Sequence, residues 1–307
     1  MALHQLAKIT IGVPNVADTV DYYTDFGLGH LGEGRFTTRE GGEQLNITHS
    51  RVRRLEEILL ACDDQDDIAR VRSNLTRLGF ESQLDGGRLT AIEPTTAIRT
   101  VLEVRPRLIQ KPVEPTVYNW PGNPARANTR ADGNVRSGAV QPLKLGHTVV
   151  GTTNLDQTYA FFVDGFGFKV SDVAKGVGAF LRCSTDHHNL LVQAAPVVFM
   201  HHSSWQVEDV DQVGRGAMAM LEDNPERHVW GLGRHYAGSN FFWYLKDPAG
   251  NFSEYYSDMD CIIDDALWKP EEVEGARGLF QWGSPPPPSF LRPEDLAAMM
   301  TGQHSDK

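Results

Sequence analysis

Two stretches of the chain repeat the same succession of a strand pattern and a helix pattern. Residues 6–13 alternate apolar and polar positions, as a strand does, and residues 15–26 then carry apolar side chains at helical spacing. Residues 145–152 and 154–166 repeat this order, and an asparagine begins each helix pattern, where its side chain can cap the helix. The repeat predicts two copies of one structural unit.

A second kind of unit also occurs twice. Residues 55–62 form a strand pattern that precedes a helix pattern over 68–78, and residues 203–207 and 210–221 repeat this pair. Short glycine-containing turns join the strands that follow, which favours mixed, curved sheets over a doubly wound parallel sheet. The predicted fold is therefore α+β: four βαβββ modules, paired into two domains whose mixed sheets are curved and incompletely closed.

Composition changes along the chain and suggests domain boundaries. Residues 106–142 are rich in Pro, Gly, Asn and Arg, which indicates a linker or a surface excursion. It separates a predicted N-terminal domain of residues 1–105 from a C-terminal domain of residues 143–258. Residues 259–307 contain four consecutive prolines and a short helix pattern over 293–300, and we expect them to extend over the second domain.

Charge and cysteine content narrow the partners and the compartment. A formal net charge of −11 disfavours nucleic acids and anionic membranes as partners. Three widely spaced cysteines without a CxxC pattern argue against a disulfide framework or a thiolate zinc site. The chain shows no signal-peptide pattern and no apolar run near the roughly 18 residues of a membrane span. We expect a cytoplasmic homo-oligomer whose stoichiometry the sequence leaves open.

Comparison of the repeated modules isolates three candidate metal ligands in the second half. His147 lies seven residues before the asparagine that begins one helix pattern, and His202 lies seven residues before the aspartate that begins the other. Glu254 lies six residues after Pro248, on the strand that closes the last module. Two imidazoles and a carboxylate form the facial pattern typical of non-haem Fe(II) oxygen chemistry, although Zn(II) and Mn(II) accept the same ligands.

The same offsets in the first half give a different set of residues, namely Lys8, Glu57 and Thr100. Lysine is a poor metal ligand, and threonine supplies no charge. We therefore expect the first half to provide the scaffold without a metal site.

The stretch Gly231–Tyr256 carries a specific motif. A Gly-Arg-His sequence ends at His235, Tyr244 follows nine residues later, and Asp-Pro-Ala-Gly-Asn then precedes Glu254. With the strands around His147 and His202, and with Asp186-His187-His188-Asn189-Leu190, this motif resembles the type I extradiol catecholic dioxygenases of the vicinal oxygen chelate superfamily. The matching motifs lie in residues 143–257, and the first half fits the family's domain without metal.

The resemblance implies an enzyme that opens the ring of a small aromatic diol with O2, to a product of the hydroxymuconic semialdehyde type. It implies Fe(II) as the cofactor, with Mn(II) as the alternative. His188 would be the acid–base group on the dioxygen side, and His235 and Tyr244 would hydrogen-bond the substrate oxygens. The implied metal ligands are His147, His202 and Glu254.

Two choices between neighbouring histidines depend on strand register. Adjacent strand residues point to opposite faces, so only one of His201 and His202 can be a ligand, and the match with His147 selects His202. Register also favours His188 over His187 as the acid–base group. Tyr244 lies in an aromatic run that could instead belong to the core.

Two other functions fit the same fold. The first is a glyoxalase-like, metal-dependent isomerase, which would draw ligands from both module pairs; Lys8 and Thr100 argue against it. The second is a non-catalytic small-molecule-binding protein, which would not need His188, His235 and Tyr244 beside a complete triad. The sequence does not select the particular catechol.

Overall fold

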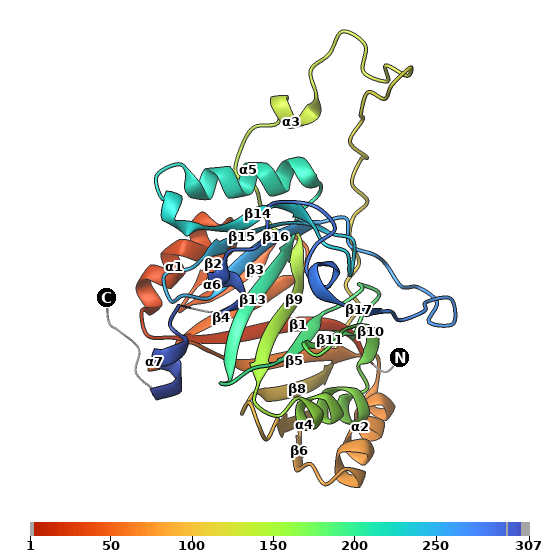
Figure 1. Ribbon diagram of the computed structural model, residues 1–307. Helices are drawn as coiled ribbons and strands as arrows, with labels where there is room; N and C mark the ends of the chain where they lie inside the picture. Colours follow the sequence, from red (N-terminus) through yellow and green to blue (C-terminus); the bar gives the residue numbers. More distant parts are fainter. Residues whose placement is uncertain (1–2, 293, 302–307) are drawn as a thin grey trace.

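The computed structural model describes residues 3–292 and 294–301 (Figure 1). Its first half forms an eight-stranded mixed sheet in the order β2-β3-β4-β1-β5-β8-β7-β6. The elements are β1 (Leu3–Val13), α1 (Val16–Asp25), β2 (Gly29–Gly32), β3 (Arg35–Thr38), β4 (Gly42–His49), β5 (Arg54–Cys62), α2 (Gln65–Arg77), β6 (Ser82–Asp85), β7 (Arg88–Ile92) and β8 (Arg99–Val104).

The second half repeats this plan in a nine-stranded sheet with the order β14-β15-β16-β13-β9-β12-β11-β10-β17. Its elements up to the end of the last module are β9 (Lys144–Thr152), α4 (Leu155–Ala160), η1 (Phe161–Phe166), β10 (Lys169–Ala174), β11 (Gly178–Arg182), β12 (Leu190–Ala194), β13 (Phe199–Gln206), α5 (Val210–Leu221), η2 (Pro225–Arg227), β14 (His228–Arg234), β15 (Phe241–Lys246) and β16 (Phe252–Ser257). Short elements of the C-terminal extension follow, namely β17 (Glu272–Val273), η3 (Gly275–Gly278), α6 (Pro288–Leu291) and α7 (Leu296–Thr301).

Each sheet contains two four-stranded modules that meet along an antiparallel seam, and β17 adds a ninth strand to the second sheet. The seam is β1–β5 in the first sheet and β9–β13 in the second, and within every module the first strand runs parallel to the last. Neither sheet closes on itself. The predicted fold of paired βαβββ modules with incompletely closed mixed sheets is confirmed.

Aromatic side chains join the two halves into one core. Phe26 at the end of α1 stacks on Tyr255 of β16, with ring centroids 3.9 Å apart, and the Tyr255 hydroxyl donates to the carbonyl of Phe26 at 2.6 Å. Tyr22 of the same helix lies 2.5 Å from the hydroxyl of Ser253. The helix of the first module thus covers the sheet of the second half, so the first half supports the strand that carries Glu254.

One helix differs from its predicted form. The pattern over 154–166 predicts a continuous helix, whereas the structure has α4 to Ala160 and then the π-helical turn η1. The turn ends at Gly167, whose φ of 86° is left-handed and therefore favours glycine. Phe161 and Phe166 of this turn are both buried in the core, so the wider turn serves their packing.

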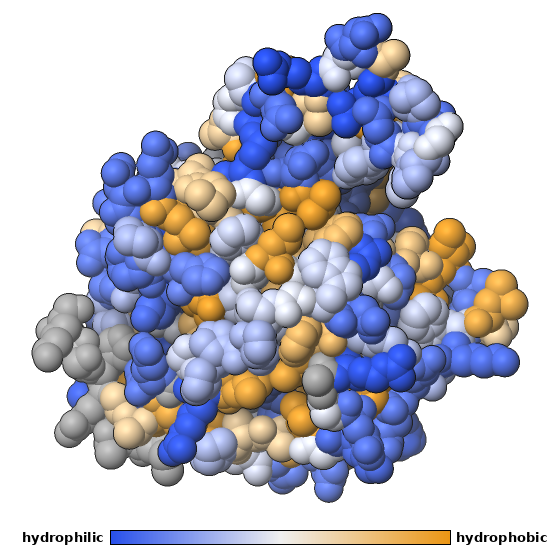
Figure 2. Space-filling model, turned by 45° about the horizontal axis from the view of Figure 1, so that its top comes forward, coloured by the Kyte–Doolittle hydropathy of each residue, from blue (hydrophilic) through white to orange (hydrophobic). Residues whose placement is uncertain are grey.

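The excursion between the sheets has little regular structure, apart from the short α3 (Asp132–Val135) and a bridge between Trp120 and Asn123. Figure 1 shows it reaching away from the two sheets, and Figure 2 shows polar side chains mixed with apolar ones on this face. Ile109 and Trp120 in this segment are 86% and 63% exposed. These apolar side chains have no cover within the described chain.

The C-terminal extension folds back over the second sheet. The helix predicted over 293–300 is observed as α7, while Pro293 and residues 302–307 lie outside the described residues. Among the described residues, no helix is both long and apolar enough to cross a membrane.

Candidate metal centre

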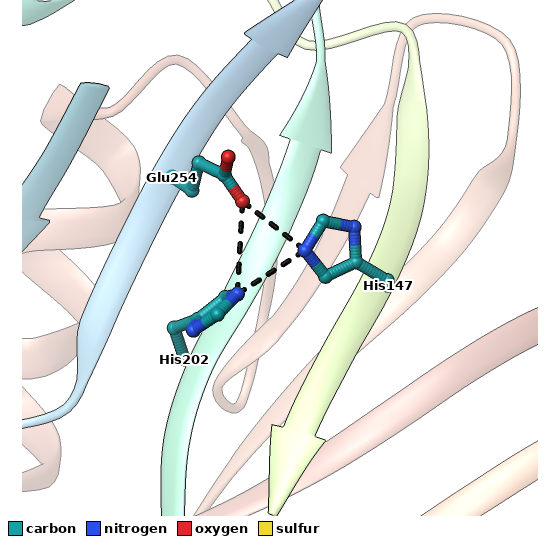
Figure 3. Close-up of side chains that lie close together, drawn as sticks. All are labelled: His147, His202 and Glu254. Atoms are coloured by element: carbon teal, nitrogen blue, oxygen red, sulfur yellow. Dashed lines mark hydrogen bonds and ion pairs between the residues drawn. The ribbon is translucent and has the colours of Figure 1, made fainter. Parts of the chain in front are cut away.

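Three adjacent strands bring His147, His202 and Glu254 together. They stand on β9, β13 and β16, which are neighbours in the second sheet, and Figure 3 shows their side chains converging. His147 Nε2 lies 3.1 Å from His202 Nε2 and 3.1 Å from Glu254 Oε2. The distance from His202 Nε2 to Glu254 Oε2 is 3.6 Å. A metal ion with bonds of about 2.1 Å holds neighbouring ligands roughly 3.0–3.4 Å apart. Two of the three distances lie in this range and the third is slightly longer, so the spacing suits a divalent ion.

The charge state of the triad also suits a metal ion. Burial by itself would raise the pKa of Glu254, but the neighbouring imidazoles of His147, His235 and His202 outweigh it and hold that pKa well below its usual range. Burial lowers the pKa of His202 well below its ordinary value. A charged carboxylate and a neutral imidazole are the forms of these side chains that bind metal ions.

The two oxygens of Glu254 have different surroundings. Oε1 accepts a hydrogen bond from Asn240 Nδ2 at 3.2 Å, which fixes the carboxylate. Oε2 faces the two imidazole nitrogens, is buried, and has no hydrogen-bond donor among the described residues. A buried carboxylate oxygen without a donor is costly unless a cation is present. The donor set therefore fits a metal ion bound by His147, His202 and Glu254.

A cavity of about 520 Å³ opens at the triad. Its lining includes His188, whose ring centroid lies 4.1 Å from that of His147, and the pair formed by His235 and Tyr244, with Nε2 and Oη 2.8 Å apart. Burial lowers the pKa of His188 well below its usual value, which leaves it neutral. Burial, with Glu254 adding to it, raises the pKa of Tyr244, which leaves its hydroxyl protonated. The cavity thus combines a neutral base with fixed polar groups.

The rest of the cavity wall is mostly apolar. Phe180 of β11 lies on the wall beside His188, and the C-terminal extension supplies Val273, Leu279 and Phe290. The carbonyl of Leu279 also accepts a hydrogen bond from His235 Nδ1. The extension therefore forms one side of the cavity and fixes a polar side chain within it.

The structure separates the members of the two histidine pairs. His202 directs Nε2 at the triad, while His201 lies beside the carbonyl of Phe290. His188 lines the cavity, while His187 lies beside the carboxylate of Asp172. His201 also lines the cavity but is not part of the triad, whereas in the second pair only His188 lines the cavity.

Strand pairing identifies the first-half counterparts of the ligands. Ser204 of β13 pairs with both His147 of β9 and Glu254 of β16. Leu59 of β5 takes this central place in the first sheet, and its partner on β1 is Lys8. Lys8 is therefore the counterpart of His147, in agreement with the sequence offsets.

The third predicted counterpart is wrong by one residue. The partner of Leu59 on β8 is Val101, so Val101 and not Thr100 corresponds to the ligand glutamate. The turn before β8 is one residue longer than the turn before β16. In the first half, the backbone N–H of Glu93 donates to the carbonyl of Ile98, five residues later. In the second half, the N–H of Asp247 donates to the carbonyl of Asn251, four residues later. An offset counted from the proline of the turn therefore misses by one.

Sequence reasoning missed three contributors to the site, Asn240, Asp172 and Phe290. Asn240 stands four residues before Tyr244, and the even spacing near a strand start was a weak signal that both face one side. Asp172 on β10 and Phe290 on α6 come from distant parts of the chain. Only the folded arrangement reveals their contacts with the histidine pairs.

A family model described as the Glyoxalase/Bleomycin resistance protein/Dioxygenase superfamily matches residues 144–255. This range contains His147, His202 and Glu254. Over this range the chain is similar to members of that superfamily. The first half, which repeats the same module pair without the ligands, lies outside the matched range.

Curated relatives in the superfamily match part of the chain. Metapyrocatechase 2 of Cupriavidus necator is 34% identical over 193 residues, which are 60% of this chain and 60% of the relative. A manganese-dependent 2,3-dihydroxybiphenyl 1,2-dioxygenase of Geobacillus genomosp. 3 is 27% identical over 177 residues, 53% of this chain and 56% of the relative. The chain therefore matches less than two thirds of the length of these relatives.

Solved structures share the fold over almost the whole chain. An Mn(II)-bound glyoxalase from Novosphingobium aromaticivorans superimposes with a TM-score of 0.72 at 23% identity, covering 93% of both chains. Homoprotocatechuate 2,3-dioxygenase from Arthrobacter globiformis gives 0.71 at 15% identity, covering 94% of this chain and 91% of the other. At these identities the likeness establishes the fold, and the arrangement of two module pairs is part of it.

Proposed function

We propose that the protein is an extradiol ring-cleaving dioxygenase, which uses Fe(II) and O2 to open a catecholic ring to a product of the hydroxymuconic semialdehyde type. The observation that carries this proposal is the triad opening onto a cavity that also holds His188, His235 and Tyr244. The names of two curated relatives, metapyrocatechase 2 and biphenyl-2,3-diol 1,2-dioxygenase, support it.

A divalent iron ion bound by the triad would supply a Lewis acid for the two catechol oxygens and a redox partner for O2. Neutral His188 is placed to accept a catechol proton and to return it to the product. The Tyr244 hydroxyl and the His235 ring are placed to hydrogen-bond a substrate oxygen and fix its orientation. The apolar wall keeps water from the reacting atoms.

Fe(II) is the metal we propose, with Mn(II) as the alternative. Both accept two imidazoles and a carboxylate. One relative is named as manganese-dependent. Metal analysis of protein purified without oxygen would decide between them.

The lining of the cavity favours an uncharged aromatic diol. Lys175 is the one cationic Lys or Arg side chain in the described lining, and it stands at the mouth, paired with Glu272 and Glu274. A carboxylated catechol would find no free cation there. We therefore propose a catechol whose substituent is apolar.

A glyoxalase-like isomerase is less consistent with the chain. Such enzymes usually draw ligands from both module pairs, and the first half offers Lys8 and Val101 at two of the three ligand positions.

Oxygen uptake with catechol tests the proposal. Protein purified anaerobically is loaded with Fe(II), mixed with catechol or a 3-alkylcatechol, and exposed to air. We expect a yellow product and one O2 consumed per product formed. Catechol binding without oxygen uptake, in protein shown to be fully loaded with iron, would contradict the proposal.

We also propose a homo-oligomer in the cytoplasm. No residue of the excursion 106–142 lines the cavity within the described chain, whereas its exposed Ile109 and Trp120 are the kind of surface that subunit contacts bury. The three cysteines are free thiols, which suits a reducing compartment. Light scattering on the purified protein would give the stoichiometry.

A further inference from the structure

The two histidine pairs beside the cavity share one hydrogen-bond arrangement. His201 Nδ1 lies 2.7 Å from His202 Nδ1, and His201 Nε2 lies 2.7 Å from the carbonyl of Phe290. His187 Nδ1 lies 3.1 Å from His188 Nδ1, and His187 Nε2 lies 3.0 Å from Asp172 Oδ2. In both pairs an outer histidine bridges an oxygen acceptor and the inner histidine that faces the site.

The pair of His201 and His202 shows what this arrangement does. A carbonyl oxygen only accepts, so His201 Nε2 must carry a hydrogen and donate it to Phe290. In a neutral ring the other nitrogen carries no hydrogen, so His201 Nδ1 is an acceptor, and it lies 2.7 Å from His202 Nδ1. His202 then donates from Nδ1 and leaves the lone pair of Nε2 free. That is the nitrogen that faces the metal site.

The pair of His187 and His188 repeats this pattern with a charged acceptor. Asp172 Oδ2 accepts from His187 Nε2, which leaves His187 Nδ1 to accept from His188 Nδ1. The lone pair of His188 Nε2 then faces the cavity. All three side chains are buried, so water does not compete for these hydrogen bonds.

The C-terminal extension holds Asp172 in this role. The backbone N–H of Glu271 donates to Asp172 Oδ1 at 2.8 Å, and the ring of Trp268 packs edge-on against His187 with centroids 5.4 Å apart. One carboxylate oxygen is thus occupied by the extension, and the other is directed at His187.

We propose that Asp172 and His187 are positioning residues that hold His188 with the lone pair of Nε2 toward the cavity. This inference rests on the proposed function, in which His188 takes a proton from a catechol hydroxyl. After the transfer His188 carries hydrogens on both nitrogens, and its positive charge faces the Asp172 carboxylate through the His187 ring. In the other pair, the outer acceptor is the neutral carbonyl of Phe290 and not a carboxylate. This fits a metal ligand, because His202 does not gain a proton and has no positive charge to stabilise.

Asp172→Asn tests the arrangement. The N–H of Glu271 keeps the amide oxygen of the new side chain, so its NH2 group points at His187 Nε2. That nitrogen must then accept, His187 donates from Nδ1, and His188 is forced to carry its hydrogen on Nε2. The substitution reverses the tautomer of His188 while preserving the volume of the side chain.

The readout is independent of activity. Protein labelled with ¹⁵N-histidine is loaded with diamagnetic Zn(II), and the ring nitrogen shifts of His188 are assigned by comparison with His188→Gln. We expect Nδ1 to be protonated in the wild type and Nε2 in D172N. With Fe(II), we expect kcat of D172N to fall about 10- to 100-fold, with KM and metal content nearly unchanged. The control is Asp265→Asn, which removes a carboxylate that binds Arg182 and so connects the extension to the sheet. It should change neither the tautomer of His188 nor kcat.

Two results would overturn the inference: a wild-type His188 with its hydrogen on Nε2, or a D172N protein with unchanged tautomer and kcat. Should D172N fail to fold, His187→Phe removes the acceptor, and His188 should then lose its fixed tautomer. If the Fe(II) protein consumes no oxygen with any catechol, the proposed function fails, while the nitrogen shifts still decide the hydrogen-bond arrangement.

Discussion

The two halves of the molecule place corresponding strands in the same order, yet the side chains at the centre of the two sheets differ in charge and in hydrogen bonding. In the first half, Lys8 lies 3.2 Å from Glu43, and Glu57 forms an ion pair with Arg99. Val101, at the third ligand position, is buried among apolar side chains. The charges at these positions therefore neutralise one another, and among the described residues they do not form a group that could hold a metal ion.

The second half gathers electron-pair donors without a matching cation. Glu43 corresponds by register to His188. The ion pair of the first half is therefore replaced by two neighbouring imidazoles, His147 and His188, whose rings are tilted by 45°. Glu254 is buried, with one oxygen lacking a hydrogen-bond donor. The comparison shows that the scaffold alone does not make a metal site. Among the described residues, the ion-pair partners of Glu254 are imidazoles and not Lys or Arg side chains.

Removing the ligand carboxylate should have the largest effect. Because outer hydrogen-bond partners of a metal site already contribute about 10- to 100-fold to affinity, loss of a direct ligand in Glu254→Gln should cost more than about 100-fold in Fe(II) affinity and abolish oxygen uptake. Elemental analysis and an oxygen electrode measure both. Glu57→Gln is the matched control in the first half and should leave both unchanged, since its ion pairs are partly exposed. Equal loss in the two variants would contradict the contrast between the halves.

Replacing the base should affect turnover without affecting the metal. His188→Gln removes the proton acceptor but none of the three ligands, so kcat should fall about 100- to 10,000-fold at normal iron content. The counterpart Glu43→Gln should change kcat less than about twofold, because that side chain pairs with Lys8 and neither residue lines the cavity. Loss of iron from the His188 variant would mean that His188 belongs to the ligand set.

The sequence predicted what depends on local pattern and repetition. The four modules could be predicted because the same strand and helix patterns repeat. His147 and His202 could be predicted because both lie seven residues before the residue that begins a helix. Thr100 was misplaced because one turn is a residue longer, and no periodicity records the length of a turn. Asp172 and Phe290 were not found because their contacts with the histidines cross 15 and 89 positions of the chain. Partners at such separations are fixed by tertiary packing, which a single sequence does not show.

The turns before the closing strands offer the smallest and most specific test of the comparison. The shorter turn of the second half holds Asp247, whose carboxylate accepts hydrogen bonds from the backbone of Ala249 and Asn251. Burial raises the pKa of Asp247 from 3.8 to about 6, although the hydrogen bonds from Asn251 oppose this shift. An acid with a raised pKa is protonated more readily in the folded state. Its ionisation therefore destabilises the fold increasingly as pH rises from about 4 through 6.

Asp247→Asn isolates this effect. The amide of the variant accepts the backbone hydrogen bonds less well than the carboxyl group, so the variant should be less stable than the wild type at every pH. Only the wild type must bury a charge as pH rises, so the stability difference should then shrink. Between pH 5 and pH 7.5, the difference in unfolding free energy between wild type and variant should narrow by roughly 1 kcal/mol. Urea unfolding of metal-free protein, followed by tryptophan fluorescence, measures it. A difference that stays constant with pH would mean that Asp247 titrates normally and that the shorter turn does not bury its charge.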